Sequence, residues 1–241
     1  MTTRIEEVVV VPVYQGGEPF QKMLQELLNY VGPQSVLVVD DGSSDNTSKI
    51  ALEHGVHLLR FENNRGKGTA LEAGLRWWCE RGAERVVTID ADGQHPPELA
   101  KALFEKSKFS QAGIVVAARN LKSREMPVHR MLSNRITTRM LSQLAGVPLF
   151  DSQSGFRCYH RRIIDQNIFP ESGRFAWESE MLVLAAQRGE GVESISMPVL
   201  YSKNSTSHIA HFKDTLRFLK LFIRLLRQKR VKNGRSEAGE Y

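Results

Sequence analysis

The chain has 241 residues, of which 41% are hydrophobic and 25% are charged. This length permits one large α/β domain with a substantial core, and the hydrophobic content excludes a globally disordered chain. The formal net charge is +6, and its concentration late in the sequence favours either an anionic partner, such as a membrane or a nucleic acid, or a solvated helix face.

Cysteine usage and the first residues favour a cytoplasmic location. Cys79 and Cys158 lack metal-site spacing and are too few for a disulfide framework, which fits a reducing compartment. Arg4, Glu6 and Glu7 interrupt any early apolar run, so no signal peptide is indicated. No stretch is apolar and long enough to cross a bilayer. We therefore expect any work at a membrane to be done from its surface.

Short apolar runs alternate with amphipathic stretches through the first half of the chain. The pattern predicts strands at 7–13, 35–39, 57–61, 85–89 and 114–118. It predicts helices at 18–30, 45–54, 68–81 and 96–106. This alternation is typical of βαβ units and therefore of an α/β fold with a mainly parallel central sheet flanked by helices.

Polar residues follow the predicted strands, where ligands bind in such sheets. The chemistry is therefore expected around Tyr14, Asp40, Asp90 and Arg119. After residue 120 the alternation is looser. Helices are predicted at 126–145 and 178–188, and extended segments at 154–159 and 191–199. We expect this second half to close the site.

The strongest chemical signal is the run Asp90–His95, which reads Asp-Ala-Asp-Gly-Gln-His after a predicted strand. Two carboxylates two residues apart reach one ion when the turn redirects them, and carboxylate and amide oxygens suit Mg²⁺ or Mn²⁺. Asp90, Asp92 and Gln94 are therefore candidate metal ligands. A divalent cation beside a diphosphate neutralises the charge that grows on a leaving group. The alternative is a turn that caps the helix predicted at Pro96.

A second signal is the pair Asp40 and Asp41 at the end of the second predicted strand. Gly42 allows a sharp turn, and Asp45 can cap the next helix. Neither role explains two adjacent acids, which repel each other. A carboxylate here can accept the imide N–H of uracil or guanine, so Asp40 and Asp41 are candidate nucleotide ligands.

Two further segments indicate anion and base binding. Residues 64–68 read Asn-Arg-Gly-Lys-Gly before a helix, and glycines beside cations at a helix start form an anion site, with a plain loop as the alternative. The segment lacks the full P-loop pattern, so ATP hydrolysis is not indicated. Tyr14, at the end of the first strand, is a candidate for stacking on a base or ribose, or a half-buried core tyrosine.

These segments occur in an order that resembles glycosyltransferase family 2, most closely the polyprenyl-phosphate sugar transferases of the dolichol-phosphate mannose synthase group. The resemblance covers residues 5 to 200. The matching segments are 11–14, 39–45, 64–68, 90–98, 118–119, 151–157 and 178–180.

The resemblance implies a nucleotide-diphospho-sugar transferase A-type fold and inverting transfer of a sugar from a UDP- or GDP-sugar with Mg²⁺ or Mn²⁺. It implies that the metal ligands are Asp90, Asp92 and Gln94, with Asp92 counted among the catalytic residues. The residues assigned to the nucleotide-sugar are Pro12, Tyr14, Asp40, Asp41, Lys67, Asp90 and Ala91.

The resemblance also implies a lipid-linked acceptor, a polyprenyl phosphate. Arg119, Arg130 and Ser133 fall near positions that hold the acceptor phosphate in such enzymes, and guanidinium groups suit that task, although the last two also fit a polar helix face. Lys203 lies in a stretch, 201–208, that is loosely similar to their basic Ser/Lys loop. The usual acid after the first-strand tyrosine is replaced by Gln15-Gly16.

An alternative is a hydroxyl acceptor, as in a glycolipid or a cell-surface polysaccharide precursor. A phosphate acceptor is already ionised, whereas a hydroxyl needs a general base. Glu180 is the candidate base, with Asp151 and Glu178 behind it, and Glu180 equally suits binding of sugar or acceptor hydroxyls.

The segment 211–230, HFKDTLRFLKLFIRLLRQKR, places apolar residues at helical spacing with the cations mainly elsewhere. This suits a basic amphipathic helix on an anionic membrane, or a helix packed on the catalytic domain. We expect a catalytic domain at 1–210, with a nucleotide-binding half at 1–120 and an acceptor half at 121–210, and a disordered tail at 231–241. The expected location is peripheral, on the inner face of the cell membrane, in cell-envelope biosynthesis.

Other classes fit less well. A sugar-phosphate nucleotidyltransferase would have a Gly-rich loop with Arg and Lys where Gly16-Gly17 stands. A phosphoacceptor signalling domain would leave Asp90 and Asp92 without a purpose. No nucleic-acid partner is expected, because the aromatic residues of the basic segment lie in an apolar stripe.

Overall fold

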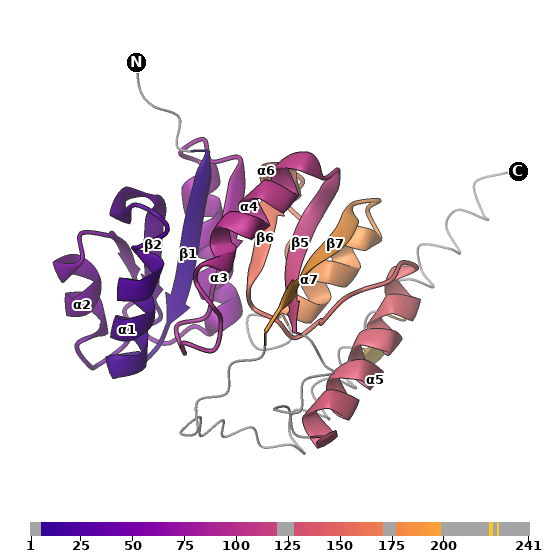
Figure 1. Ribbon diagram of the computed structural model, residues 1–241, viewed down its shortest axis with the longest axis horizontal. Coiled ribbons are helices and arrows are strands. Elements are labelled where there is room, and N and C mark those ends of the chain that lie inside the picture. Colours follow the sequence, from indigo (N-terminus) through magenta and orange to yellow (C-terminus); the bar gives the residue numbers. More distant parts are fainter. Residues whose placement is uncertain (1–5, 120–127, 171–176, 199–221, 224–225, 227–241) are drawn as a thin grey trace, which may run out of the picture.

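The computed structural model describes residues 6–119, 128–170, 177–198, 222, 223 and 226, with the side chains of 128–130 excepted. Seven strands form one sheet in the order β3-β2-β1-β4-β6-β5-β7 (Figure 1). The strands are β1 Glu7–Val13, β2 Val36–Asp40, β3 His57–Arg60, β4 Arg85–Thr88, β5 Ala112–Arg119, β6 Arg157–His160 and β7 Gly191–Met197. Among the described strands β6 alone runs antiparallel, to both β4 and β5, so the predicted mainly parallel sheet is confirmed.

Helices cover both faces of the sheet (Figure 1). They are α1 Gly17–Leu27, α2 Thr47–Glu53, α3 Lys67–Cys79, α4 Leu99–Phe109, α5 Val128–Ala145, α6 Arg161–Asp165 and α7 Trp177–Ala186, with a 3₁₀ turn at Pro33–Ser35. The valines of β1 alternate between two cores because successive strand residues point to opposite faces. Val8 and Val10 pack with α3, α5, α6 and α7, and Val9 and Val11 pack with α1, α2 and α4.

Most element boundaries differ from the prediction by about one to three residues, and one helix was not predicted. Helix α4 begins at Leu99 rather than at residue 96, because Pro96 and Pro97 form the preceding turn, in which the Leu99 amide donates to the Pro96 carbonyl at 3.1 Å. The segment predicted as extended from residue 154 becomes a strand only at Arg157. Helix α6 was not predicted, since five residues are too few to show a helical period.

The topology brings polar residues to one edge of the sheet. The parallel strands β1, β2, β4 and β5 end at this edge, and β6 begins there because it runs the other way. The residues after β4 therefore meet the loop at 151–156. None of the helices in the described ranges combines the length and apolar character that spanning a bilayer requires.

Candidate functional site

The centre of the site is an ammonium group between two carboxylates. Lys67 Nζ, at the start of α3, lies 2.7 Å from Asp90 Oδ1, just beyond β4, and 2.6 Å from Glu178 Oε1 in the first turn of α7. The side chains of Lys67 and Asp90 keep 26% and 21% of their surface exposed, and that of Glu178 keeps 7%. Burial opposes both charges, but the ion pairs raise the pKa of Lys67 and hold the pKa of Asp90 well below its usual range. Both groups are therefore ionised.

Asp90 is held by its surroundings as well as by Lys67. A Cβ on Gly155 would lie 2.6 Å from Asp90 Oδ2, so a larger residue there would displace this carboxylate. Thr88 Oγ1 donates to the Gly155 carbonyl at 2.8 Å, which fixes the loop against β4. The buried His95 ring places Nε2 3.6 Å from Asp90 Oδ2 and packs against Phe156.

Asp92 and Gln94 complete the predicted metal set. Asp92 is exposed, and its Oδ1 accepts the Gln94 backbone N–H at 2.9 Å. Lost hydration and the neighbouring Asp90 charge raise the pKa of Asp92, whereas Asp90 has the Lys67 ammonium as its counter-charge. No three His, Cys, Asp or Glu side chains of the described ranges form a metal cage. Two carboxylates with a neutral oxygen nevertheless fit Mg²⁺ or Mn²⁺, because Mg²⁺ is usually held by one or two carboxylates plus substrate phosphates.

Asp41 orients the loop that carries Lys67. Its Oδ1 accepts the Arg65 N–H at 2.7 Å, and its Oδ2 accepts the Gly66 N–H at 2.8 Å. Gly42 has a φ of +78°, and a Cβ there would lie 2.6 Å from the Asn63 carbonyl carbon. The second strand end is thereby fastened to the start of α3.

Asp40 has structural partners of its own. It is fully buried, its Oδ1 accepts the Ser43 N–H at 2.8 Å, and its Oδ2 accepts the Ser48 hydroxyl. Arg60 Nε lies 3.9 Å from the same Oδ2. The hydrogen bonds of both carboxylates stabilise the turns that follow β2 and precede α3. The nucleobase contacts predicted for Asp40 and Asp41 stay predictions.

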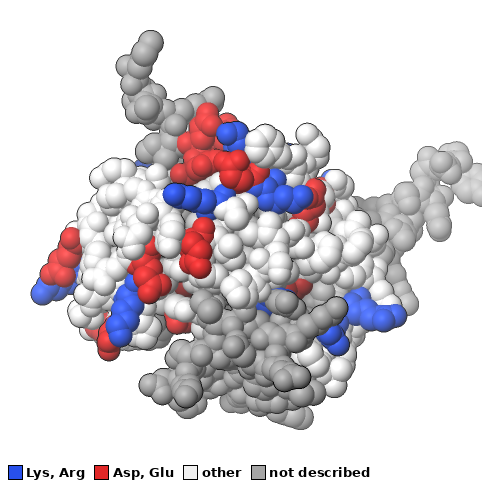
Figure 2. Space-filling model, in the orientation of Figure 1, with Lys and Arg blue, Asp and Glu red and all other residues white. Residues whose placement is uncertain are grey.

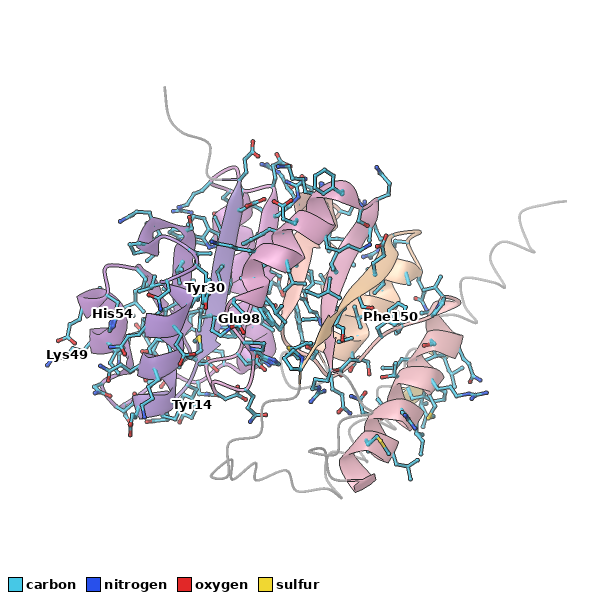
Figure 3. The ribbon with its side chains drawn as sticks, in the orientation of Figure 1. Tyr14, Tyr30, Lys49, His54, Glu98 and Phe150 are labelled. Atoms are coloured by element: carbon cyan, nitrogen blue, oxygen red, sulfur yellow. The ribbon has the colours of Figure 1, made fainter. Side chains whose placement is uncertain are left out.

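The end of β1 presents an aromatic ring to solvent. Tyr14 is 52% exposed and lies at the lower edge of the left-hand part of the molecule in the view of Figure 3. Pro12 is buried within β1, and Ala91 is half-buried beside Asp90. Gln15, in place of the usual acid, has a φ of +54° and donates its N–H to Ser43 Oγ at 2.9 Å. The exposed ring remains available for stacking on a base.

On the other side of the site, Asp151 is saturated with donors. Its Oδ2 accepts Arg119 Nε at 2.7 Å and the Arg119 backbone N–H at 3.0 Å, while its Oδ1 accepts Arg119 Nη2 at 2.7 Å and Asn134 Nδ2 at 2.8 Å. Burial opposes the charge, but these bonds hold the pKa of Asp151 below its ordinary value. A carboxylate so engaged is a poor general base, and it joins β5 to α5.

The remaining predicted residues divide between described and undescribed parts of the chain. Ser133 is exposed on α5, and Glu180 is buried in the first turn of α7, next to the Lys67 partner Glu178. The side chain of Arg130 and the whole of Lys203 lie outside the described residues.

Arg157 is a site-building residue to which the sequence assigned no role. Its fully buried guanidinium donates Nε to the Ser154 carbonyl at 2.7 Å, Nη2 to the Ser152 carbonyl at 3.0 Å and Nη1 to the Glu178 carbonyl at 2.5 Å. It therefore fixes the 151–156 loop to α7. Its position between Phe156 and Cys158, at the start of an apolar strand, was the sequence feature that could have indicated a buried arginine with a structural role.

Comparison with known proteins relates this geometry to an enzyme family. The model of the family described as glycosyl transferase family 2 matches residues 8–171. UDP-N-acetylglucosamine–dolichyl-phosphate N-acetylglucosaminyltransferase of Methanococcus voltae is 26% identical over 244 residues, which cover 92% of this chain and 95% of that protein. Undecaprenyl-phosphate mannosyltransferase of Micrococcus luteus is 29% identical over 203 residues, which cover 80% of this chain and 82% of that protein.

Solved structures share the fold. Glucosyl-3-phosphoglycerate synthase from Mycobacterium tuberculosis, in complex with Mn²⁺, UDP and glucosyl-3-phosphoglycerate, matches 92% of this chain and 78% of that chain with a TM-score of 0.69 and 17% identity. Another crystal structure of that enzyme contains Mg²⁺ and UDP. The predicted A-type nucleotide-diphospho-sugar transferase fold is thereby confirmed.

Proposed function

Because the chain belongs to glycosyl transferase family 2 and is a nucleotide-sugar glycosyltransferase, we propose that it transfers a sugar to a polyprenyl phosphate with a divalent cation at Asp90 and Asp92. The observation that carries the donor half is the carboxylate pair at the end of β4, beside the Lys67 ammonium. The acceptor half is supported by the two relatives that are named for dolichyl- and undecaprenyl-phosphate. Family membership favours sugar transfer over the nucleotidyltransferase alternative.

The donor is a UDP- or GDP-sugar whose diphosphate lies against Lys67. An ammonium at the start of a helix is suited to a phosphate oxygen. The exposed ring of Tyr14 stacks on the nucleoside. A bound Mg²⁺ or Mn²⁺ supplies positive charge that stabilises the departing diphosphate. Asp90, Asp92 and Gln94 are the residues that would hold it.

In the reaction, an acceptor oxygen forms a bond to the anomeric carbon as the bond from that carbon to the diphosphate oxygen breaks, with inversion. A phosphate acceptor arrives ionised and needs no base. A hydroxyl acceptor would need one, and Glu180 is then the proposed base. Asp151 is a poor one, because its carboxylate is occupied by Arg119 and Asn134. Arg119, Arg130, Ser133 and Lys203 are proposed to contact the acceptor phosphate.

The test is sugar transfer by the Asp92→Ala variant from UDP- and GDP-sugars to a polyprenyl phosphate in the presence of Mn²⁺. We expect turnover to fall by about 100-fold or more, because the loss of metal-supported charge stabilisation raises the barrier by several kcal/mol. Thermal unfolding of the wild type with Mn²⁺ and UDP or GDP should show a rise in Tm that Mn²⁺ alone does not give.

The matched control is Asp165→Ala, which removes another exposed carboxylate, one that pairs with Arg161 on the α6 surface at 3.1 Å. Its turnover should equal that of the wild type. Undiminished turnover in Asp92→Ala would refute the metal role, and wild-type protein that binds no nucleoside diphosphate with Mn²⁺ would refute the proposed function.

A further inference from the structure

The ammonium of Lys67 occupies a position on the Asp90 carboxylate that a bound metal ion would be expected to take. Its Nζ is 2.7 Å from Asp90 Oδ1, the same carboxylate that follows β4 and begins the proposed metal set. Its second partner, Glu178 Oε1 at 2.6 Å, belongs to α7. The protein therefore already holds a cation, the Lys67 ammonium, on the Asp90 carboxylate that the divalent cation needs as a ligand.

Two cations compete for one carboxylate when no further anion is present. Mg²⁺ binds carboxylate oxygens at about 2.0–2.1 Å, so an ammonium left on the same carboxylate would lie within a few ångströms of the metal and repel it. The exposed fractions of Lys67 and Asp90, 26% and 21%, leave the ammonium room to move. Glu178 is almost fully buried and keeps Lys67 anchored at the site when the bond to Asp90 is lost.

A nucleoside diphosphate removes this conflict. Its oxygens offer the ammonium a new partner, and they also supply ligands to a metal that the described residues do not enclose in a cage of three or more His, Cys, Asp or Glu. Metal and nucleotide then favour each other's binding, and the coupling must be reciprocal in the two affinities.

We propose that Lys67 is the resident counter-ion of Asp90 in the free protein and competes with the divalent cation, so that the metal binds tightly only together with the nucleoside diphosphate. This inference rests on the proposed function and adds to it a positioning residue and an order of events. As the metal binds to Asp90, the Lys67 ammonium exchanges its ion pair with Asp90 for one with the diphosphate of the donor.

The test measures Mn²⁺ binding by electron paramagnetic resonance, which counts free ion and needs no turnover. The full chain is compared with the double variant Lys67→Met/Glu178→Gln, which removes the ammonium and one of its partners without changing the net charge. Without nucleotide, the variant should bind Mn²⁺ about tenfold more tightly than the wild type, a modest effect for a unit charge at this distance. The gain in Mn²⁺ affinity that UDP or GDP produces should shrink by about the same factor.

Two further proteins separate competition from other causes. Arg65→Met removes a cation two residues away whose side chain packs over Phe61, and it should change Mn²⁺ affinity far less. If the double variant does not fold, as judged by circular dichroism, the single variant Lys67→Gln replaces it. This variant also lacks the ammonium and should likewise bind Mn²⁺ more tightly than the wild type without nucleotide. Unchanged or weaker Mn²⁺ binding in the folded Lys67 variant, or an equal gain in Arg65→Met, overturns the inference while leaving the proposed function intact. Failure of the wild type to bind UDP or GDP with Mn²⁺ overturns the proposed function itself.

Discussion

The aspartates at the carboxyl edge of the sheet differ in their partners, and the partners separate structural from chemical roles. Asp40 accepts a backbone N–H from its own loop, and Asp41 accepts two backbone N–H groups from the neighbouring loop before α3. Asp151 is enclosed by Arg119 and Asn134. Asp90 faces a side-chain ammonium, and Asp92 faces solvent. A metal can therefore bind the carboxylates of Asp90 and Asp92 without breaking the backbone hydrogen bonds that Asp40, Asp41 and Asp151 accept.

Asp151→Asn tests the structural role of the enclosed carboxylate. The change removes the carboxylate charge that pairs with the Arg119 guanidinium, and we expect a loss of about 3 kcal/mol at pH 7, the lower end for a buried pair, because Arg119 remains 24% exposed. Since the folded pKa of Asp151 is lowered from 3.8, its stabilisation is complete well above pH 3.8 and is lost as the pH falls through the folded pKa. The free-energy difference between wild type and variant should therefore shrink in acid.

Urea unfolding at neutral pH and near pH 3 measures this difference. Asp165→Asn is the control, because its pair with Arg161 is exposed and contributes about 0–1 kcal/mol. A variant as stable as the wild type at pH 7, or a difference that grows in acid, would contradict the assignment of Asp151 as a structural anion.

Residues adjacent in sequence were predictable as a group, and residues brought together by the fold were not. Asp90 and Asp92 could be paired because a strand precedes them and two residues separate their positions. Lys67 was predicted to bind an anion, but its partner Glu178 comes from the other half of the chain. Only the strand order shows that α3 and α7 start at the same edge of the sheet.

At the scale of elements, helix α3 carries Lys67 and must pack closely on the sheet. Gly74 allows this approach, since a Cβ there would lie 2.5 Å from Val10 Cγ1 and 3.1 Å from Val39 Cγ2. Those valines belong to β1 and β2, the strands that end at Val13, just before Tyr14, and at Asp40. The position of the ammonium thus depends on a glycine in the middle of a helix.

Gly74→Ala should destabilise the protein although alanine is the better helix former. Alanine gains about 1 kcal/mol in helix propensity, but overpacking against Val10 and Val39 costs about 1–3 kcal/mol, and we expect a net loss of about 1 kcal/mol. Denaturant midpoints at constant m measure it. Gly32→Ala is the matched control, because no atom lies within 4 Å of its Cβ and its φ is −67°. That change should be neutral or stabilising by up to about 1 kcal/mol, and an equal loss in both variants would argue against the clash.

Element types were predictable where the hydrophobic period was long enough to read. β1 was predicted with its observed ends, because buried valines fill it. Tertiary context set the other boundaries. Ser154 is kept out of β6 because its hydroxyl donates to the Ala117 carbonyl at 2.8 Å, which turns the loop toward the site. Such a long-range bond has no local sequence signature.

At the scale of the whole molecule, the net charge lies in one segment. Residues 211–230 contain seven Lys or Arg and one Asp, a net charge of +6 that equals the charge of the entire chain. Acidic and basic side chains of the described residues are interspersed on the face in Figure 2. Apart from residues 222, 223 and 226, this segment and the tail at 231–241 lie outside the described residues. Phe222 packs against the core that contains α3 and α7, while Ile223 is exposed.

This distribution of charge predicts that the full chain binds anionic membranes from the surface through 211–230. Each basic residue near an anionic surface contributes about 1 kcal/mol, so the double variant Lys220→Glu/Arg224→Glu should bind liposomes containing phosphatidylserine at least about tenfold more weakly. Co-sedimentation at low and high salt measures the effect, and added salt should narrow the difference. The control Lys49→Glu/Lys108→Glu makes the same change in net charge at exposed positions of α2 and α4. Equal weakening in both variants would show that total charge, not this segment, governs attraction to the membrane. Undiminished binding in the first variant would place the attraction elsewhere on the protein.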